Sequence, residues 1–182
     1  TTLPKHWEDF AFSPSSNQIE AKSIGVDIDN RWLVVANEDG SNPRAVQELA
    51  DQADRLMVDW SPNSQMIAMY ANPEGLDREN LYFVGQNNEN FRLLTLPGFG
   101  FEGQWSPLGN QLLFSVYNKN SQYKPELWIS DITPDTSGSA RRSLQVETWA
   151  EKCAFTDEDT LYCAIPRTLE AGSGIFGTNF KA

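Results

Sequence analysis

The chain has 182 residues, enough to bury one hydrophobic core or part of a larger one. Its 14 basic and 25 acidic residues give a formal net charge of −11, and an acidic surface repels phosphate backbones, so no nucleic acid partner is expected. No apolar run approaches the roughly 20 residues that span a bilayer, so no membrane span is expected in this segment. The chain opens on Thr1 rather than Met, and we expect a mature or excised segment.

One strand–turn–strand pattern recurs along the chain. Its three clear copies place an aromatic residue before a Ser-Pro turn: Phe12-Ser13-Pro14, Trp60-Ser61-Pro62 and Trp105-Ser106-Pro107. A decayed copy has Thr156-Asp157 instead. Proline fixes φ at the second position of a turn, and serine and asparagine hydrogen-bond to nearby backbone. The turns begin at residues 13, 61, 106 and 156, which are 48, 45 and 50 residues apart, and this period predicts a structural repeat.

Apolar and aromatic runs around each turn predict four strands in each complete repeat. Four strands per unit is the count of a propeller blade. In chain order the main runs are 31–37 and 44–49, then 55–60, 66–70, 80–84 and 91–96, then 101–105, 111–117, 126–130 and 141–146, and last 152–155 and 160–165. A break is expected at 72–75, and long polar loops at 118–124 and 133–140.

The predicted fold is therefore all-β. It consists of β-propeller blades, about 3.5–4 four-stranded antiparallel units, in one segment over residues 1–182. The repeats cover approximately 7–49, 55–97, 101–147 and 150–182, with the last one incomplete. We expect these units to be part of a larger propeller.

The three Ser-Pro turns, each followed by an apolar strand, resemble the W-S-P-D-G signature of TolB-like (WD-type) β-propeller repeats. The resemblance covers about residues 7–165. The chain departs from the signature at Asn63-Ser64 and Leu108-Gly109, where the family prefers Asp-Gly, and at Thr156-Asp157. Residues 148–166 are also similar to uncharacterised bacterial propeller-like proteins. The resemblance implies a bacterial protein that lies outside the cytoplasm (periplasmic, cell-surface or secreted) and binds other proteins.

The two cysteines lie symmetrically about a turn. Cys153 and Cys163 are each five residues from Glu158, so a symmetric antiparallel register places them opposite each other on one face. The tighter, non-hydrogen-bonded pairing would bring their β-carbons within disulfide reach. We predict a disulfide, which requires an oxidising compartment; the alternative is two buried thiols.

Candidate chemistry is sparse. His6 is the only histidine, so a histidine metal site or a Ser-His-Asp triad has little to build on. No nucleophile–base pair or metal cluster is visible, so we predict no enzyme, no catalytic residue, no metal and no cofactor. The G-x-G-x-x-G segments at 98–103 and 172–177 are not followed by a helix pattern, which a dinucleotide site requires.

Two further patterns have an ordinary structural interpretation. The carboxylates of 27–30 and 157–159 could hold Ca²⁺, but turn carboxylates are more often solvated. Trp60 and Trp105 could stack on a sugar, but their shared position in the repeat favours filling the gap between blades.

The sequence therefore predicts a non-catalytic binding or scaffold module that mediates protein–protein interaction. The alternative is an accessory propeller of a larger secreted hydrolase, a peptidase or glycosidase, whose catalytic domain lies elsewhere. Open blade faces at Phe10, Phe12, Leu161 and Ile165 predict cover by further blades of the same polypeptide, or oligomer formation or a protein partner at the open edges. The rival is a four-blade ring closed by a strand near 175–180.

Overall fold

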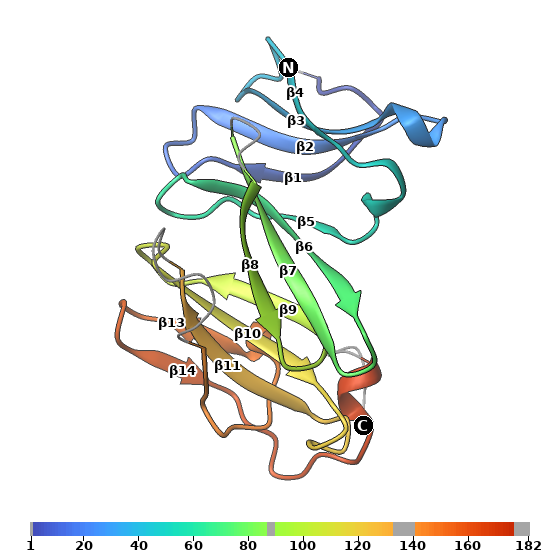
Figure 1. Cartoon of the computed structure of the whole chain (residues 1–182). Helices are drawn as coiled ribbons and strands as arrows, with labels where there is room; N and C mark the ends of the chain where they lie inside the picture. The colour runs from blue at the N-terminus through green and yellow to red at the C-terminus, as the bar shows by residue number, and fades with distance from the viewer. Residues whose placement is uncertain (1, 87–89, 133–140, 177–182) are drawn as a thin grey trace. The chain divides into compact units, whose positions relative to one another are not determined.

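The computed structural model describes residues 2–86, 90–132 and 141–176. Within these residues every strand belongs to an antiparallel sheet, and the helical segments are four short 3-10 turns (Figure 1). Three sheets have four strands, each joined in chain order, and one has two. The predicted all-β fold of four-stranded antiparallel blades is confirmed.

The first two blades follow the repeat pattern. The first contains β1 (Trp7–Phe12), β2 (Gln18–Ile24), β3 (Arg31–Asn37) and β4 (Arg44–Glu48). The second contains β5 (Leu56–Val58), β6 (Met66–Glu74), β7 (Arg78–Gly85) and β8 (Asn90–Leu96).

The later blades are less regular. The third contains β9 (Phe99–Trp105), β10 (Gln111–Tyr117), β11 (Pro125–Asp131) and the two-residue β12 (Arg142–Ser143). The fourth has only β13 (Cys153–Phe155) and β14 (Leu161–Cys163) among the described residues.

Three local predictions are wrong. Residues 72–74 of the expected break at 72–75 belong to β6, because the chain turns only at Gly75, whose φ of 76° suits glycine. The strand expected over 141–146 stops at Ser143, because Gln145 has a left-handed φ of 57° that a strand cannot continue. The closing strand expected near 175–180 is replaced at residues 175 and 176 by the 3-10 turn Ser173–Phe176, and its remainder, like the loop 133–140, lies outside the described residues.

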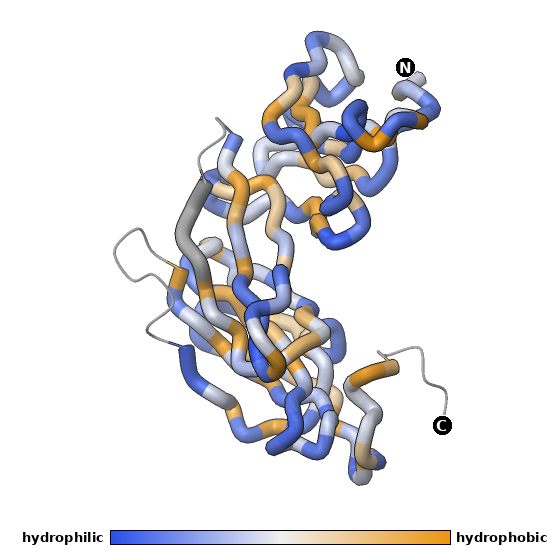
Figure 2. Tube along the Cα trace, turned by 45° about the vertical axis from the view of Figure 1, so that its right-hand side comes forward, coloured by the Kyte–Doolittle hydropathy of each residue, from blue (hydrophilic) through white to orange (hydrophobic). Residues whose placement is uncertain are grey.

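The chain divides into two compact units. Unit 1 comprises residues 1–71 and 82–91, and unit 2 comprises residues 72–81 and 92–182. In Figure 2 hydrophobic and hydrophilic residues alternate along many of the strands, as expected for strands with distinct faces.

Unit 1 is built around β3, both of whose faces are buried. Leu33 and Val35 pack on one side with Trp60 and Ile67, all 6% exposed or less. The alternate residues of β3 pack on the other side, where the N-terminal Leu3 also contributes. The face expected to be open at this end is thus partly covered by the chain itself, although Phe10 and Phe12 remain 47% and 59% exposed.

The core of unit 2 joins the third and fourth blades. Leu113, Leu127 and Ile129 pack against Ala150 and Cys153. Leu161, expected on an open face, instead packs against this cluster, whereas Ile165 is 57% exposed. The two-stranded fourth blade is therefore held by apolar contacts with its neighbour in the same unit.

The repeat turns are stabilised by their buried serines, and the third turn borrows a partner. In the second repeat the Ser61 hydroxyl accepts the Met66 N–H (2.9 Å) and lies 2.8 Å from Asn63 Oδ1. The third repeat has Leu108 at the position of Asn63, so it lacks this acceptor. Glu158, from the decayed fourth repeat, replaces it: Oε1 accepts the Ser106 hydroxyl (2.7 Å) and Oε2 accepts the Leu108 N–H (2.9 Å).

Replacing Glu158 by alanine is expected to lower the free energy of unfolding by about 2 kcal/mol, because it leaves the fully buried Ser106 hydroxyl without this acceptor. Urea titration of the variant measures the loss. Asp159→Ala, an exposed change in the same turn, is the matched control and should stay within about 0.5 kcal/mol of the parent protein. Equal losses in the two variants would show that the Glu158 contact is not a stabilising one.

Candidate functional site

Two hollows meet on unit 2 and share Pro97, Asn118 and Asn120. The first hollow has a volume of about 600 Å³ and the second of about 440 Å³. Beyond the shared residues the first hollow is lined by Glu126, Trp128, Ser143, Gln145, Val146 and Glu147. The second is lined by Asp77, Arg78, Thr95, Leu96, Lys119 and Arg141. Together they form one groove, which we call the rim groove.

Asn118 fixes the loop between β10 and β11. Its side-chain oxygen accepts the N–H groups of Asn120 (2.8 Å) and Ser121 (3.0 Å). Its side-chain nitrogen donates to Pro97 O (2.9 Å) and to Glu126 Oε2 (3.2 Å). A single amide thus holds the loop, the start of β11 and the segment before β9 in one arrangement.

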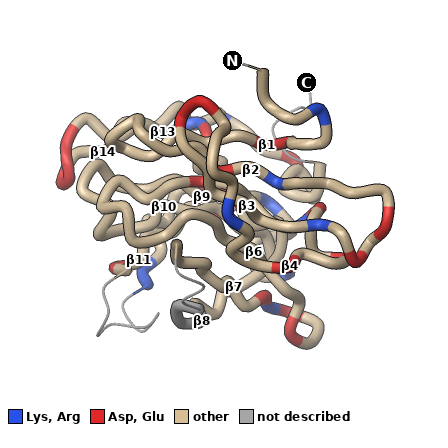
Figure 3. Tube along the Cα trace, turned by 90° about the horizontal axis from the view of Figure 1, so that it is seen from above, with Lys and Arg blue, Asp and Glu red and all other residues tan. Residues whose placement is uncertain are grey.

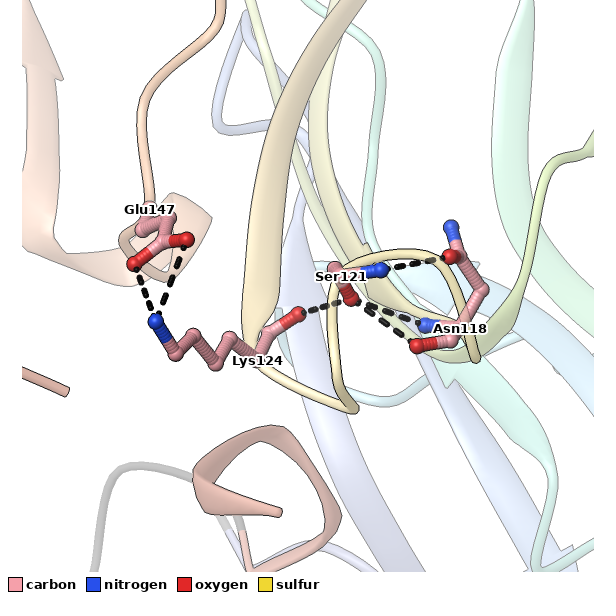
Figure 4. A network of polar contacts seen from close by, with 4 residues as sticks. All are labelled: Asn118, Ser121, Lys124 and Glu147. Atoms are coloured by element: carbon pink, nitrogen blue, oxygen red, sulfur yellow. Dashed lines mark hydrogen bonds and ion pairs between the residues drawn. The ribbon is translucent and has the colours of Figure 1, made fainter. Parts of the chain in front are cut away.

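Ser121 and Lys124 extend the polar network of Asn118 behind the groove lining (Figure 4). The Ser121 hydroxyl lies 3.0 Å from Asn118 O and 2.8 Å from Lys124 O, and it accepts the Asn118 N–H at 3.2 Å. The Lys124 ammonium reaches Glu147, which follows β12, at 3.2 and 3.4 Å from its two oxygens. The loop is therefore linked to the segment after β12 at Glu147, one of the residues that line the first hollow.

The same loop has an unusual backbone. Gln122 and Tyr123 both have left-handed φ angles, 56° and 58°, which are uncommon for residues other than glycine and asparagine. Their carbonyls accept the N–H groups of Gly172 (2.9 Å) and Gly174 (2.8 Å). A β-carbon on Gly174 would lie 2.7 Å from Tyr117 Cβ, so this close approach requires glycine. The residues in and before the C-terminal 3-10 turn thus stabilise the loop through these two backbone hydrogen bonds.

The two halves of the groove differ in charge. Two carboxylates and no cationic side chain line the first hollow, whereas three cationic side chains and one carboxylate line the second. In the second hollow Arg141 is fixed by a hydrogen bond from Nη1 to Thr95 O. Elsewhere acidic residues lie mainly in turns and connections, as Figure 3 shows. A gathering of three cations is notable in a chain with a net charge of −11.

Unit 1 contains a different polar cluster, which is centred on a buried glutamate. Glu20 on β2 is fully buried, and neither carboxylate oxygen has a hydrogen-bond partner. Burial, with a smaller contribution from the nearby Asp59, raises the pKa of Glu20 to about 10, so this side chain is neutral at pH 7. Burial also raises the pKa of Asp59 to about 6. Lys22, on the same face of β2, pairs instead with Asp9 at 2.6 Å.

The residues of the repeat signature lie in the blades and do not line the groove. Ser13, Ser61 and Ser106 are 4% exposed or less, and Trp60 and Trp105 are 6% and 9% exposed. The carboxylates of 27–30 flank or lie in the 3-10 turn Ile28–Asn30, and those of 157–159 lie in the turn between β13 and β14. Of the segments with G-x-G-x-x-G spacing, 98–103 runs into β9 and the described part of 172–177 into a 3-10 turn.

The cysteines face each other on the fourth blade. Cys153 pairs directly with Cys163 in the register of β13 and β14, and a disulfide joins them in the structure. Across the described ranges, no group of three or more histidine, cysteine or acidic residues is placed to hold a metal ion. None of the described helices is long and apolar enough to cross a membrane.

Sequence reasoning located the groove only in part. The polar loop predicted at 118–124 supplies Asn118 and Asn120 to the wall that the two hollows share. Trp128, Glu147 and Arg78 were missed because each comes from a different segment, and only the strand register brings them together. Glu20 had a visible signal: counted from the repeat turns, it occupies the position held by Ala68 and Leu113 in the next two repeats.

Comparison with known proteins places the fold. No protein-family model matches the chain, and no curated protein matches it. The acylaminoacyl peptidase of Pyrococcus horikoshii superposes with a TM-score of 0.58 at 14% identity, over 80% of this chain and 26% of that chain. An uncharacterized protein of Listeria monocytogenes gives a TM-score of 0.51 at 10% identity, over 75% of this chain and 43% of that chain. TolB from Acinetobacter baumannii gives a TM-score of 0.45 at 17% identity, over 74% of this chain and 29% of that chain.

The chain is a β-propeller module, and the predicted resemblance to TolB-like propeller repeats is confirmed at the level of the fold. It spans less than half the length of each of these similar structures. At this level of identity the likeness shows the fold alone.

Proposed function

We propose that this module is a non-catalytic binding propeller that engages another protein through the rim groove, outside the cytoplasm. The observation that carries the proposal is the groove itself. Its walls are fixed by the hydrogen bonds of Asn118 and Ser121 and by the Lys124–Glu147 ion pair. Its lining is charged, and a preformed polar surface binds without the cost of ordering its own side chains. The disulfide supports an oxidising compartment.

Site-specific photo-crosslinking in the native host tests this function. A photoreactive residue at Asn120, which is exposed in the wall shared by the two hollows, is expected to give one discrete protein adduct. Asn42, which lies in an exposed turn of unit 1, serves as the matched control. Combining the Asn120 crosslinker with Asn118→Ala should reduce the adduct at least fivefold, because the change releases the loop that forms the wall. An adduct of equal yield from Asn42 would contradict the proposal.

A second candidate is an accessory propeller of a larger secreted hydrolase. The observation in its favour is the superposition with the acylaminoacyl peptidase, in which 80% of this chain matches 26% of that chain. The full reading frame distinguishes the two candidates. A G-x-S-x-G nucleophile elbow beyond residue 182 would favour the hydrolase, whereas a lipid or transmembrane anchor before residue 1 would favour the binding module.

A further inference from the structure

We propose that the rim groove binds an extended segment of the partner protein that carries one basic and one acidic side chain. The lysine or arginine side chain would occupy the first hollow, and the aspartate or glutamate side chain the second. This inference rests on the proposed function and specifies which surface of a partner would fit.

The first hollow has the chemistry of a site for an organic cation. Glu126 and Trp128 are two residues apart on β11, so they lie on the same face of the sheet. Glu147 faces the same hollow from the segment after β12. An aromatic ring beside carboxylates attracts ammonium and guanidinium groups through both the ring face and charge-assisted hydrogen bonds.

The carboxylates of this hollow are held in place by neighbouring residues but can still accept further hydrogen bonds. Asn118 donates to only one oxygen of Glu126, which sets the orientation of that carboxylate. The Glu147 side chain remains 48% exposed even though Lys124 contacts it. Lys124 already contacts both oxygens of Glu147, at 3.4 and 3.2 Å, so an incoming cation would share this carboxylate with Lys124.

The second hollow has the opposite preference. Arg78, Lys119 and Arg141 line it, with Asp77 as its one carboxylate. The Asp77–Arg78 contact is 3.7 Å long, and the two side chains are 81% and 55% exposed, so it competes weakly with an incoming anion. The hydrogen bond from Arg141 to Thr95 O holds that guanidinium at the groove. An acidic side chain is therefore the complementary occupant.

The geometry favours an extended peptide over a compact ligand. The two hollows share a wall, so both charged groups of the ligand must be joined across Asn118 and Asn120. An extended chain advances about 3.3 Å per residue, so a few residues suffice to link the charges. β12 pairs with β11 at Trp128 and Ile129, and the hydrogen bonds of Leu144 and Val146 with the Leu127 backbone continue this pairing beside the first hollow.

Binding is measured by NMR with blocked peptides that contain one lysine and one glutamate separated by one to four serines. The indole N–H signal of Trp128, identified with Trp128→Phe, reports on the first hollow. At least one spacing is expected to shift this signal. Replacing the lysine of that peptide by glutamine should weaken binding about tenfold, as should raising the salt concentration to 1 M.

Variants assign the two charges to the two hollows. Glu147→Gln should weaken binding of the lysine-containing peptide about tenfold but leave binding of the peptide with glutamine in place of lysine unchanged. Arg78→Gln should likewise weaken binding of the glutamate-containing peptide but leave binding of a peptide with glutamine in place of glutamate unchanged. Glu38→Gln, an exposed change of equal charge in unit 1, is the control and should have no effect. The charge assignment would be overturned if no peptide spacing shifted the Trp128 signal. It would also be overturned if the variants lost equal affinity for the charged and the neutral peptides. Loss of the Asn120 crosslink alone would overturn the proposed function and not this charge preference.

Discussion

Replacing Glu20 by glutamine is expected to stabilise the protein progressively as the pH rises. The folded state holds the pKa of Glu20 at about 10, against 4.5 for an unburied glutamate. Folding therefore favours the protonated form, and this contribution to stability is complete below pH 4.5 and is lost as the pH rises toward 10. Glutamine has nearly the same shape and does not titrate, so the variant avoids that loss.

The expected difference between the variant and the parent protein grows by roughly 4 kcal/mol between pH 5 and pH 8. Urea unfolding at several pH values measures it, and the slope with pH is the informative quantity because the packing cost of the amide is the same at each pH. Glu48→Gln, an exposed change on β4, provides the control and should give a flat difference. A flat difference for Glu20→Gln as well would mean that Glu20 is solvated or paired in solution.

Removing the Cys153–Cys163 disulfide is expected to lower the free energy of unfolding of unit 2 by about 3 kcal/mol, the value for a closed loop of about 11 residues. β13 and β14 have three residues each, and a two-stranded hairpin of this size is marginal alone. The bridge and the apolar contacts of Cys153 with Leu113 and Ile129 hold it in place.

The measurement compares the parent protein with a variant carrying Cys153→Ala and Cys163→Ala, with and without reductant. Reductant should destabilise the parent protein to nearly the level of the variant, while the variant itself should not respond. Mass spectrometry of the folded, never-reduced protein under non-reducing conditions checks the bond directly. Two free thiols in that sample would show that the predicted disulfide does not form.

The sequence carried enough information for the blades because their spacing depends on local signals. Ser-Pro turns and β-rich runs recur with the period of one blade, and β3 appears over the predicted residues 31–37. Strand ends were harder, because they depend on single backbone conformations. The left-handed φ of Gln145 ends β12 early, and no pattern of neighbouring residues marks it.

The rim groove required information that lies beyond any one segment. Its two ends are set by residues far apart in the chain, Arg78 and Glu147, and by the register that aligns β11 with β12. A sequence can predict a polar loop, but it does not predict which charged residues of other segments lie across a groove from that loop. Glu20 differs, because a repeat protein supplies its own comparison: a carboxylate at a position that is apolar in two other repeats is a local anomaly.

The contact of Glu158 with the third turn has a consequence for how this chain can be cut or exchanged. A repeat inherited as residues 101–147 would arrive without the acceptor that its own Ser106 and Leu108 need. The boundary of the third sequence repeat therefore differs from the boundary of the segment that satisfies its hydrogen bonds. A fragment that keeps the third turn intact must extend past Glu158. Gene duplication or domain shuffling that broke the chain between the third and fourth repeats would produce a weakened blade, whereas a break after Cys163 would preserve both the turn and the hairpin that supports it.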